Sequence, residues 1–368
     1  MAAVEPIEST GSGPRRRLLL GVAGVLVLAA VFVAGLTWAK WLPYAQKARH
    51  LSATHTWPGG TMFADSGKPG AAPTVSGAGH FTGAYFQEIW PGFLAALLIA
   101  AAFDSLVPRA WLRRLLNRRT RLGQAVAGGT AALPSLMCTC CSSPLVVGLR
   151  KRGVGTTASL AYWVGNPVLN PAVLVFLFLV APWQFGVVRV VMGLALVVGG
   201  TMLVTRLTGR AAGGDERPLP PELTSPEPAD PVRFGQFPFR FARSLLQLAA
   251  VLIPAYVVVL FVLGYLSGWL SDFSGLDARL GIAAVLACAV VGTLLVIPTG
   301  GEIPVVLALT AAGVGAGSAG ALLITLPALS VPSMVMVGRA LSWRVTLAMA
   351  AVVAAAGLVA GILLWALI

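Results

Sequence analysis

Three cysteines fall within four residues, in the string Cys138-Thr139-Cys140-Cys141. Thiolates are soft ligands that prefer soft partners such as Cu(I) or Zn²⁺, and trivalent arsenic shares that softness. A helix that begins beside them would raise the thiolate fraction. The string therefore predicts a soft-ion or metalloid site formed by all three side chains. The alternative is that cysteine serves here as a small residue for close packing.

Glu302 is the acidic residue of a second short string, Pro298-Thr-Gly-Gly-Glu-Ile-Pro304. A charged side chain at membrane depth costs about 2.5–3.5 kcal/mol on insertion scales, so its presence suggests a function. We expect Glu302 to exchange a proton and to couple transport to the proton gradient. The alternative is a carboxylate that caps a broken helix through backbone N–H groups.

Prolines and small polar side chains surround both strings. Proline leaves a backbone carbonyl without its usual donor, and a nearby amide or hydroxyl can satisfy that carbonyl or hold a substrate. Structural and substrate-binding roles are equally open for the two asparagines. The substrate-binding candidates are Cys138, Cys140, Cys141, Pro144, Asn166, Asn170, Pro304 and Ser330.

The elements that position these residues must lie in a membrane. Hydrophobic residues make up 57% of the 368 residues and charged residues 11%, against roughly 25% charged in an ordinary soluble chain. A soluble protein of this size could not bury so much apolar surface. We therefore predict an all-α, multi-pass protein of the cytoplasmic membrane.

The net charge of +13 is distributed as a topology signal. Lysine and arginine cluster in short runs between apolar stretches, as the positive-inside rule requires. No basic face is interleaved with aromatic residues, which argues against nucleic acid as a partner. The expected partners are membrane lipid and a small-molecule or metalloid solute, and a homo-oligomer stays open.

The two halves of the chain repeat each other. Cys138–Leu169 aligns with Pro298–Leu329 at an offset of 160 residues, without a gap. The matched positions include two prolines and a Gly-Val-Gly triplet, which shared hydrophobicity alone does not explain. By the positive-inside rule, the span before the first block runs toward the cytoplasm and the span before the second runs away from it. This predicts inverted-topology repeats, an architecture common among secondary transporters.

The domain boundaries follow from these signals. Residues 1–39 form a cytoplasmic tail and a signal-anchor helix, 40–88 an extracytoplasmic loop, and 89–208 the first transmembrane repeat. Residues 209–240 are a flexible cytoplasmic linker and 241–368 the second repeat. In each repeat a broken or re-entrant hairpin carries the candidate site, because irregular backbone at membrane depth must be buried in protein or line a cavity.

The sequence lacks the motifs that mark several other function classes. No G-x-x-x-x-G-K-[ST], H-E-x-x-H or G-x-S-x-G string occurs, so we expect neither an ATP-driven pump nor an enzyme, and no cofactor. A thiol-redox protein built from inverted repeats needs a reactive cysteine in each half, and the second half has Pro298, Gly300 and Gly301 at the matching positions. This redox class and a non-transporting, metal-handling scaffold remain the alternatives to a permease.

The blocks Pro134–Pro171 and Pro298–Ser333 together resemble the signature of the YraQ/ArsP-type predicted permeases, and the resemblance extends from Trp90 to the C-terminus. It implies a permease, and for members resembling ArsP it implies export of trivalent organoarsenicals. Cys138, Cys140 and Pro144 match the cysteine–proline motif, and Glu302 and Pro304 match the second motif. Cys141, the outer loop and the N-terminal span depart from the simpler members, which leaves the substrate open.

The inverted arrangement makes a topological prediction. Reporter fusions after Leu116 and within residues 213–228 should both read cytoplasmic, and a fusion near Asp272 should read external, because the arginine-rich loops mark the inner face. A cytoplasmic reading at Asp272 would exclude the inverted arrangement.

Overall fold

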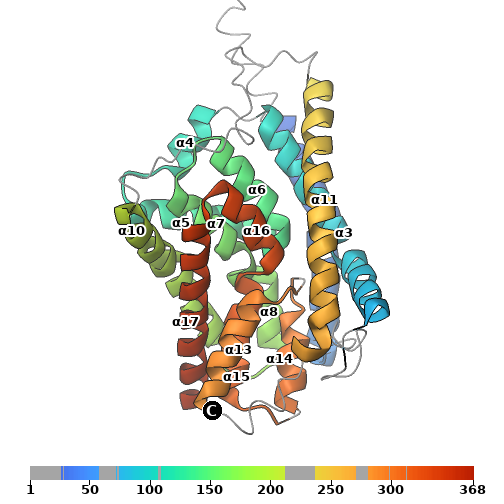
Figure 1. The fold of residues 1–368 in the computed structure, drawn as a ribbon, viewed down its shortest axis with the longest axis vertical. Coiled ribbons are helices and arrows are strands. Elements are labelled where there is room, and N and C mark those ends of the chain that lie inside the picture. The colour runs from blue at the N-terminus through green and yellow to red at the C-terminus, as the bar shows by residue number, and fades with distance from the viewer. Residues whose placement is uncertain are drawn as a thin grey trace, which may run out of the picture.

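The computed structural model describes residues 26–27, 29–57, 72, 74–106, 109–211, 237–270, 281–297, 299–311 and 313–368. Within these residues all the regular elements are helices (Figure 1), which confirms the all-α prediction. Four of these helices, continuous or nearly so, are long and apolar enough to cross a bilayer: Val75–Ala102, Thr156–Val180, Trp183–Gly209 and Trp343–Leu367. A fifth span is formed if Ala316–Ala328 and Val331–Ala340, bent by 47° at their junction, are counted together. The chain is therefore a multi-pass membrane protein.

The helices before residue 212 are η1 (Thr37–Trp41), α2 (Leu42–Thr54), α3 (Val75–Leu106), α4 (Arg109–Leu116), α5 (Arg121–Ala132), η3 (Leu133–Ser135), α6 (Thr139–Lys151), α7 (Thr156–Val168), α8 (Pro171–Val180), α9 (Trp183–Leu194), η4 (Ala195–Gly200) and α10 (Thr201–Ala211). Those after residue 236 are α11 (Phe237–Leu270), α13 (Ile282–Leu294), α14 (Glu302–Ala311), α15 (Ala316–Ala328), α16 (Val331–Ala340) and α17 (Trp343–Leu367).

The sequence repeat is also a repeat of helix boundaries. Helix α7 spans residues 156–168 and α15 spans 316–328, so both ends are displaced by the same 160 residues. Helices α8 and α16 obey the same rule, and α9 and α17 begin at matching positions. The turn before α7 and the turn before α15 each use a glycine with positive φ, Gly153 at 79° and Gly313 at 87°, a conformation that glycine adopts without steric cost.

The helix breaks lie at or just before the prolines. We expected interruptions at Pro134, around Cys138–Pro144 and through Pro298–Pro304. The first hairpin does turn at η3, which contains Pro134, and residues 299–301 form a turn, but α6 continues through Pro144 and α14 has Pro304 in its first turn. A proline near a helix start forfeits few backbone bonds, and neighbouring helices hold such a segment in place.

The N-terminal region departs from the prediction more strongly. The expected loop at 40–88 contains α2 and the first turns of α3. Its glycines and prolines suggested a loop, yet Pro43 lies in the first turn of α2, where proline is favoured. The described part of the expected anchor, residues 29–36, is helical and continues through η1 into α2. Residues 18–25 of the anchor and most of the 209–240 linker lie outside the described residues.

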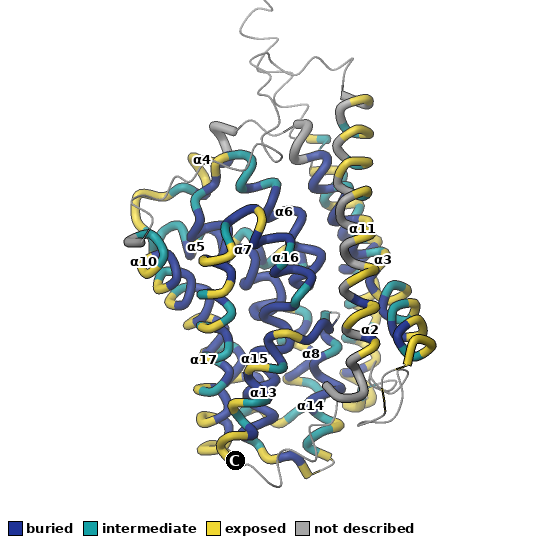
Figure 2. The backbone as a smooth tube through the Cα atoms, in the orientation of Figure 1, coloured by how far each residue is buried: buried dark blue, intermediate teal, exposed yellow. Residues whose placement is uncertain are grey.

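Small residues let the central helices approach closely. A Cβ on Gly128 of α5 would lie 2.2 Å from the carbonyl oxygen of Ala158 in α7, and a Cβ on Gly361 of α17 would lie 2.5 Å from that of Gly317 in α15. Helices α3 and α11 pack together along one edge of the molecule (Figure 1). In contrast, α6, α7 and α16 are buried along most of their length (Figure 2), and these helices carry much of the candidate site.

Candidate functional site

Two of the three clustered thiols form a close pair at the start of α6. Cys138 is the N-cap residue and has extended backbone geometry. Its Sγ lies 3.2 Å from Sγ of Cys141, because residues three apart share one face of a helix. Both side chains are buried. The pair therefore presents two sulfur atoms side by side at a helix N-terminus.

Cys140 has further neighbours on α3 and before α16. Its Sγ lies 3.6 Å from the Tyr85 hydroxyl of α3 and 4.0 Å from the Ser330 hydroxyl before α16. Within the described part of the chain, no three His, Cys, Asp or Glu side chains are placed to hold a metal ion. Cys138 and Cys141 therefore form the closest pair, while Cys140, which also interacts with Cys138, has further contacts with Tyr85 and Ser330. The site of three convergent thiols stays a prediction.

The start of α6 meets the start of α16, and so joins the two repeats. The Thr139 hydroxyl lies 3.2 Å from the Ser330 hydroxyl. Ser330 and Ser333 form a reciprocal capping box at the start of α16. Helix N-termini carry partial positive charge and free N–H groups, so this first junction favours anionic or electron-rich groups such as thiolates.

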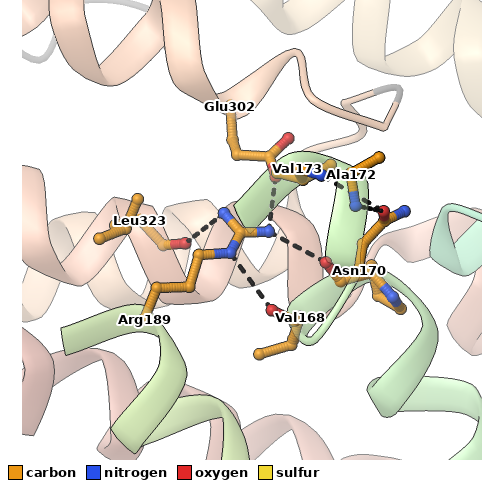
Figure 3. Close-up of polar contacts among 8 residues, drawn as sticks. Val168, Asn170, Ala172, Val173, Arg189, Glu302 and Leu323 are labelled. Carbon is orange, nitrogen blue, oxygen red and sulfur yellow. Dashed lines mark hydrogen bonds and ion pairs between the residues drawn. The ribbon is translucent and has the colours of Figure 1, made fainter. Parts of the chain in front are cut away.

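A second junction joins the repeats through a buried ion pair. Glu302, the first residue of α14, accepts a hydrogen bond of 2.7 Å from Nη2 of Arg189 in α9 (Figure 3). Both side chains are almost completely buried. The same nitrogen donates to the Pro167 carbonyl at 2.9 Å. A buried charge needs such compensation, so the partner of Glu302 is a fixed cation.

Arg189 also binds backbone carbonyls from both repeats, at the end of α7 and within α15. Its Nε donates to the Val168 carbonyl at 3.2 Å and its Nη1 to the Leu323 carbonyl at 3.4 Å (Figure 3). Val168 ends α7 and Leu323 lies in α15, so one guanidinium contacts three helices besides its own. Cations are favoured at helix C-termini, where carbonyls lack intrahelical partners.

Sequence reasoning missed Arg189 and placed only apolar or small residues around Glu302. The signal was present, because Arg189 is the lone charged residue of the apolar stretch 186–205. An ionisable residue at membrane depth is expected to have a functional partner. The two sequence signals lie 113 positions apart, and the fold brings them together.

The two asparagines have different roles. Asn166 uses both ends of its amide locally: Oδ1 accepts from Ser135 and Nδ2 donates to the Tyr162 carbonyl at 2.9 Å. Asn170 caps α8, with Oδ1 accepting from the N–H groups of Ala172 and Val173. Its Nδ2 is buried without a hydrogen-bond partner. Asn170 is therefore the asparagine with a donor to offer a solute.

A second missed residue is Lys40, which was expected to begin an outer loop. It belongs to η1, and its side chain is only 9% exposed. A Cβ added to Gly92 of α3 would lie 3.1 Å from Lys40 Nζ and 3.7 Å from Cys141 Sγ. The ammonium and the thiol thus converge on the same glycine, where any larger residue would collide with the lysine.

Comparison with known proteins agrees with this architecture. Residues 74–365 match the ArsP-type family, described as predicted permeases. The chain belongs to this permease family. It is 34% identical over 331 residues to the UPF0718 protein YraQ of Escherichia coli strain K12, with 90% of this chain and 92% of that protein covered. No solved structure matches the permease. Both junctions lie inside residues 74–365, whereas Lys40 precedes them and falls within the stretch aligned with YraQ.

The buried ion pair predicts a large and non-additive effect on stability. Arg189→Met should lower the free energy of unfolding by about 3–5 kcal/mol, because it leaves the Glu302 charge uncompensated. The double variant Arg189→Met/Glu302→Gln should recover most of this loss, since replacing both members of a buried pair is often nearly neutral. Denaturation of the detergent-solubilised variants gives both values.

Arg206→Met, which removes an exposed arginine of α10, is the matched control and should leave the denaturation midpoint unchanged. A double variant as unstable as the sum of its two single variants would show that Arg189 and Glu302 contribute independently.

Proposed function

We propose that this permease is a secondary exporter of a small solute, with a thiophilic trivalent organoarsenical as the best candidate substrate. The observation that carries the proposal is the Cys138–Cys141 pair, two buried thiols 3.2 Å apart at a junction of helix ends from both repeats. In secondary transporters, broken helices at the interface between repeats form the substrate site near the bilayer midplane. The pair has the position and the chemistry of such a site.

The way in which the helices are paired supports inverted halves. The first junction joins α6 of repeat one to α16 of repeat two. Under the 160-residue offset its counterpart joins α14 to α8, and the backbone of Gly300, before α14, does approach Val173 of α8. In Figure 1 the hairpin α5–α6 lies in the upper half of the molecule and its counterpart α13–α14 in the lower half. A two-fold axis in the membrane plane would place two corresponding hairpins in opposite halves of the molecule in this way.

The donor set favours a metalloid with two exchangeable bonds over a metal ion. Structural zinc needs four ligands, and the described residues hold no cluster of three. An organoarsenical of the form R–As(OH)₂ needs only two thiols, because each As–S bond replaces one As–O bond. The proposed direction, export, rests on the resemblance to ArsP-type permeases and on the toxicity expected of a dithiol-binding solute.

The Arg189–Glu302 pair supports a proton-coupled mechanism. The carboxylate holds a guanidinium that is bound to carbonyls of α7 and α15. Protonation would remove the negative charge and weaken a contact that ties the two repeats together. Proton uptake at Glu302 would in this way favour a movement of one repeat against the other, which is the step that alternating access requires.

A transmembrane thiol-redox protein is the second candidate, because the same 3.2 Å approach would allow Cys138 and Cys141 to form a disulfide. The second repeat has glycine at the positions that match Cys140 and Cys141, so a relay of thiols across the membrane lacks its second half. A redox protein would need both cysteines but would confer no arsenical resistance.

The thiol pair can be tested by resistance. In cells lacking other arsenical exporters, Cys138→Ser/Cys141→Ser should reduce resistance to a trivalent organoarsenical by at least about tenfold, at unchanged protein abundance, because a hydroxyl is a poor ligand for a soft centre. Cys288→Ser, at a buried cysteine of α13, is the matched control and should retain resistance. Full resistance in the double variant would make the two thiols packing residues.

Proton coupling can be tested with Glu302→Gln, which keeps the shape and hydrogen-bonding capacity of the side chain but cannot ionise. The variant should bind substrate yet fail to accumulate it in vesicles energised by a proton gradient. Glu88→Gln, at an exposed carboxyl of α3, should transport normally. Wild-type transport by Glu302→Gln, with unchanged dependence on pH, would place the coupling group elsewhere.

A further inference from the structure

Lys40 is a buried cation that the ion pair between the repeats does not involve. It sits in η1, a π-helical segment that continues into α2. Its Nζ lies 3.4 Å from the Tyr44 hydroxyl and 5.3 Å from the centre of that ring. Tyr44 in turn packs edge-on against Phe176 of α8, with ring centres 5.6 Å apart. The N-terminal helix therefore contacts both the thiol junction and α8.

The partners of the Lys40 ammonium do not include a carboxylate. Of the residues that the structure describes, none with an acidic side chain lies within ion-pair distance of Lys40, and its hydrogen bond is to the neutral Tyr44. Its electrostatic neighbours, besides Tyr44, are Cys141 and Cys138. A buried ammonium is costly without a counter-charge. Besides the Tyr44 phenol, the groups beside it that can ionise to a negative charge are the two thiols.

We propose that Lys40 is the fixed counter-charge of the Cys138–Cys141 pair and that it restricts this site to uncharged, thiol-reactive solutes, excluding thiophilic metal cations. The inference rests on the proposed function, because it concerns the same thiol site. One thiolate and one ammonium give the empty site no net charge. A metal cation would add charge beside the ammonium, with little water to screen the repulsion, whereas an uncharged electrophile adds none.

The binding reaction balances without an oxidant. R–As(OH)₂ meets one thiolate, one thiol and the Lys40 ammonium. Two As–S bonds form and two As–O bonds break, and the two hydroxyl groups leave as water after taking up the thiol proton and a proton from the ammonium. Arsenic stays trivalent, and the bound site is again uncharged. Lys40 thus acts twice, first by holding the thiolate and then by supplying a proton to a leaving hydroxyl.

Lys40 precedes residues 74–365, which match the family model, but lies within the stretch aligned with YraQ, because that alignment covers 331 of the chain's 368 residues and leaves at most 37 uncovered. Solute selection would then depend on a helix that precedes the residues matched by the family model. The thiol pair alone would accept soft cations and soft metalloids alike, and the helix that brings Lys40 to the pair would narrow this choice.

The test uses the purified full-length protein and two probes, phenylarsine oxide as the uncharged dithiol reagent and Ag⁺ as the soft cation. Lys40→Met removes the charge at similar length, Lys40→Arg keeps it, and Arg49→Met removes an exposed charge from α2 as a matched control. Relative to wild type, Lys40→Met should bind phenylarsine oxide at least about tenfold more slowly and Ag⁺ at least about tenfold more tightly. Lys40→Arg and Arg49→Met should stay within about threefold of wild type for both probes.

Equal binding of both probes by wild type and Lys40→Met would overturn the role of Lys40 and leave the proposed function intact. Failure of wild type to bind phenylarsine oxide would instead contradict the proposed thiol site. Should Lys40→Met not fold, the wild type supplies the readout: its ultraviolet thiolate absorbance at neutral pH should vanish in Cys138→Ser/Cys141→Ser. No such difference would mean that Lys40 holds no thiolate.

Discussion

A helix that ends inside a membrane leaves backbone N–H and carbonyl groups without partners, and the centre of this permease satisfies them with side chains. Asn170 caps the start of α8, and Ser330 and Ser333 cap the start of α16. At a helix C-terminus, where the free groups are carbonyls, Arg189 donates to the carbonyls that end α7. Because no bulk water is available at that depth, each broken helix requires its own polar neighbour. The positions of the functional candidates follow from that requirement.

The two junctions share one framework but differ in chemistry. Under the 160-residue offset, Glu302 corresponds to Ser142 and Arg189 to Met349, while Cys138, Cys140 and Cys141 correspond to Pro298, Gly300 and Gly301. The boundaries of α7 and α8 recur in α15 and α16, whereas the side chains of the junctions have diverged. One junction holds a pair of cysteines beside the Lys40 ammonium, and the other holds a complete ion pair. In the proposed exporter, the solute binds at the first junction and the proton acts at the second.

Local patterns in the sequence predicted the class of the fold well. Composition indicated the membrane environment, and matched prolines with the Gly-Val-Gly triplet indicated a repeat, in which α7 and α8 have the same boundaries as α15 and α16. The expected loop at 40–88 is largely helical in its described residues, because Pro43 starts a helix and Gly77 and Gly79 lie within one. The three-thiol site stays a prediction: Cys138 and Cys141 form a close pair, and Cys140 also contacts Tyr85 and Ser330 on other elements. Arg189 and Lys40 were missed because their partners lie far away in the sequence, and a pattern read along the chain carries no such contact. The roles of the site residues stay predictions.

Each junction takes groups from both repeats, and this has a consequence for the ancestry of the permease. A protein of half the length would own α6 but not α16, or Arg189 but not Glu302, so one copy could not form either junction alone. Two copies would have to pair, and with inverted halves they would have to insert into the membrane in opposite orientations. Gene duplication and fusion would then have fixed a pairing that a dual-topology homodimer had to find by chance. Only after fusion could one partner acquire the cysteines and the other the carboxylate.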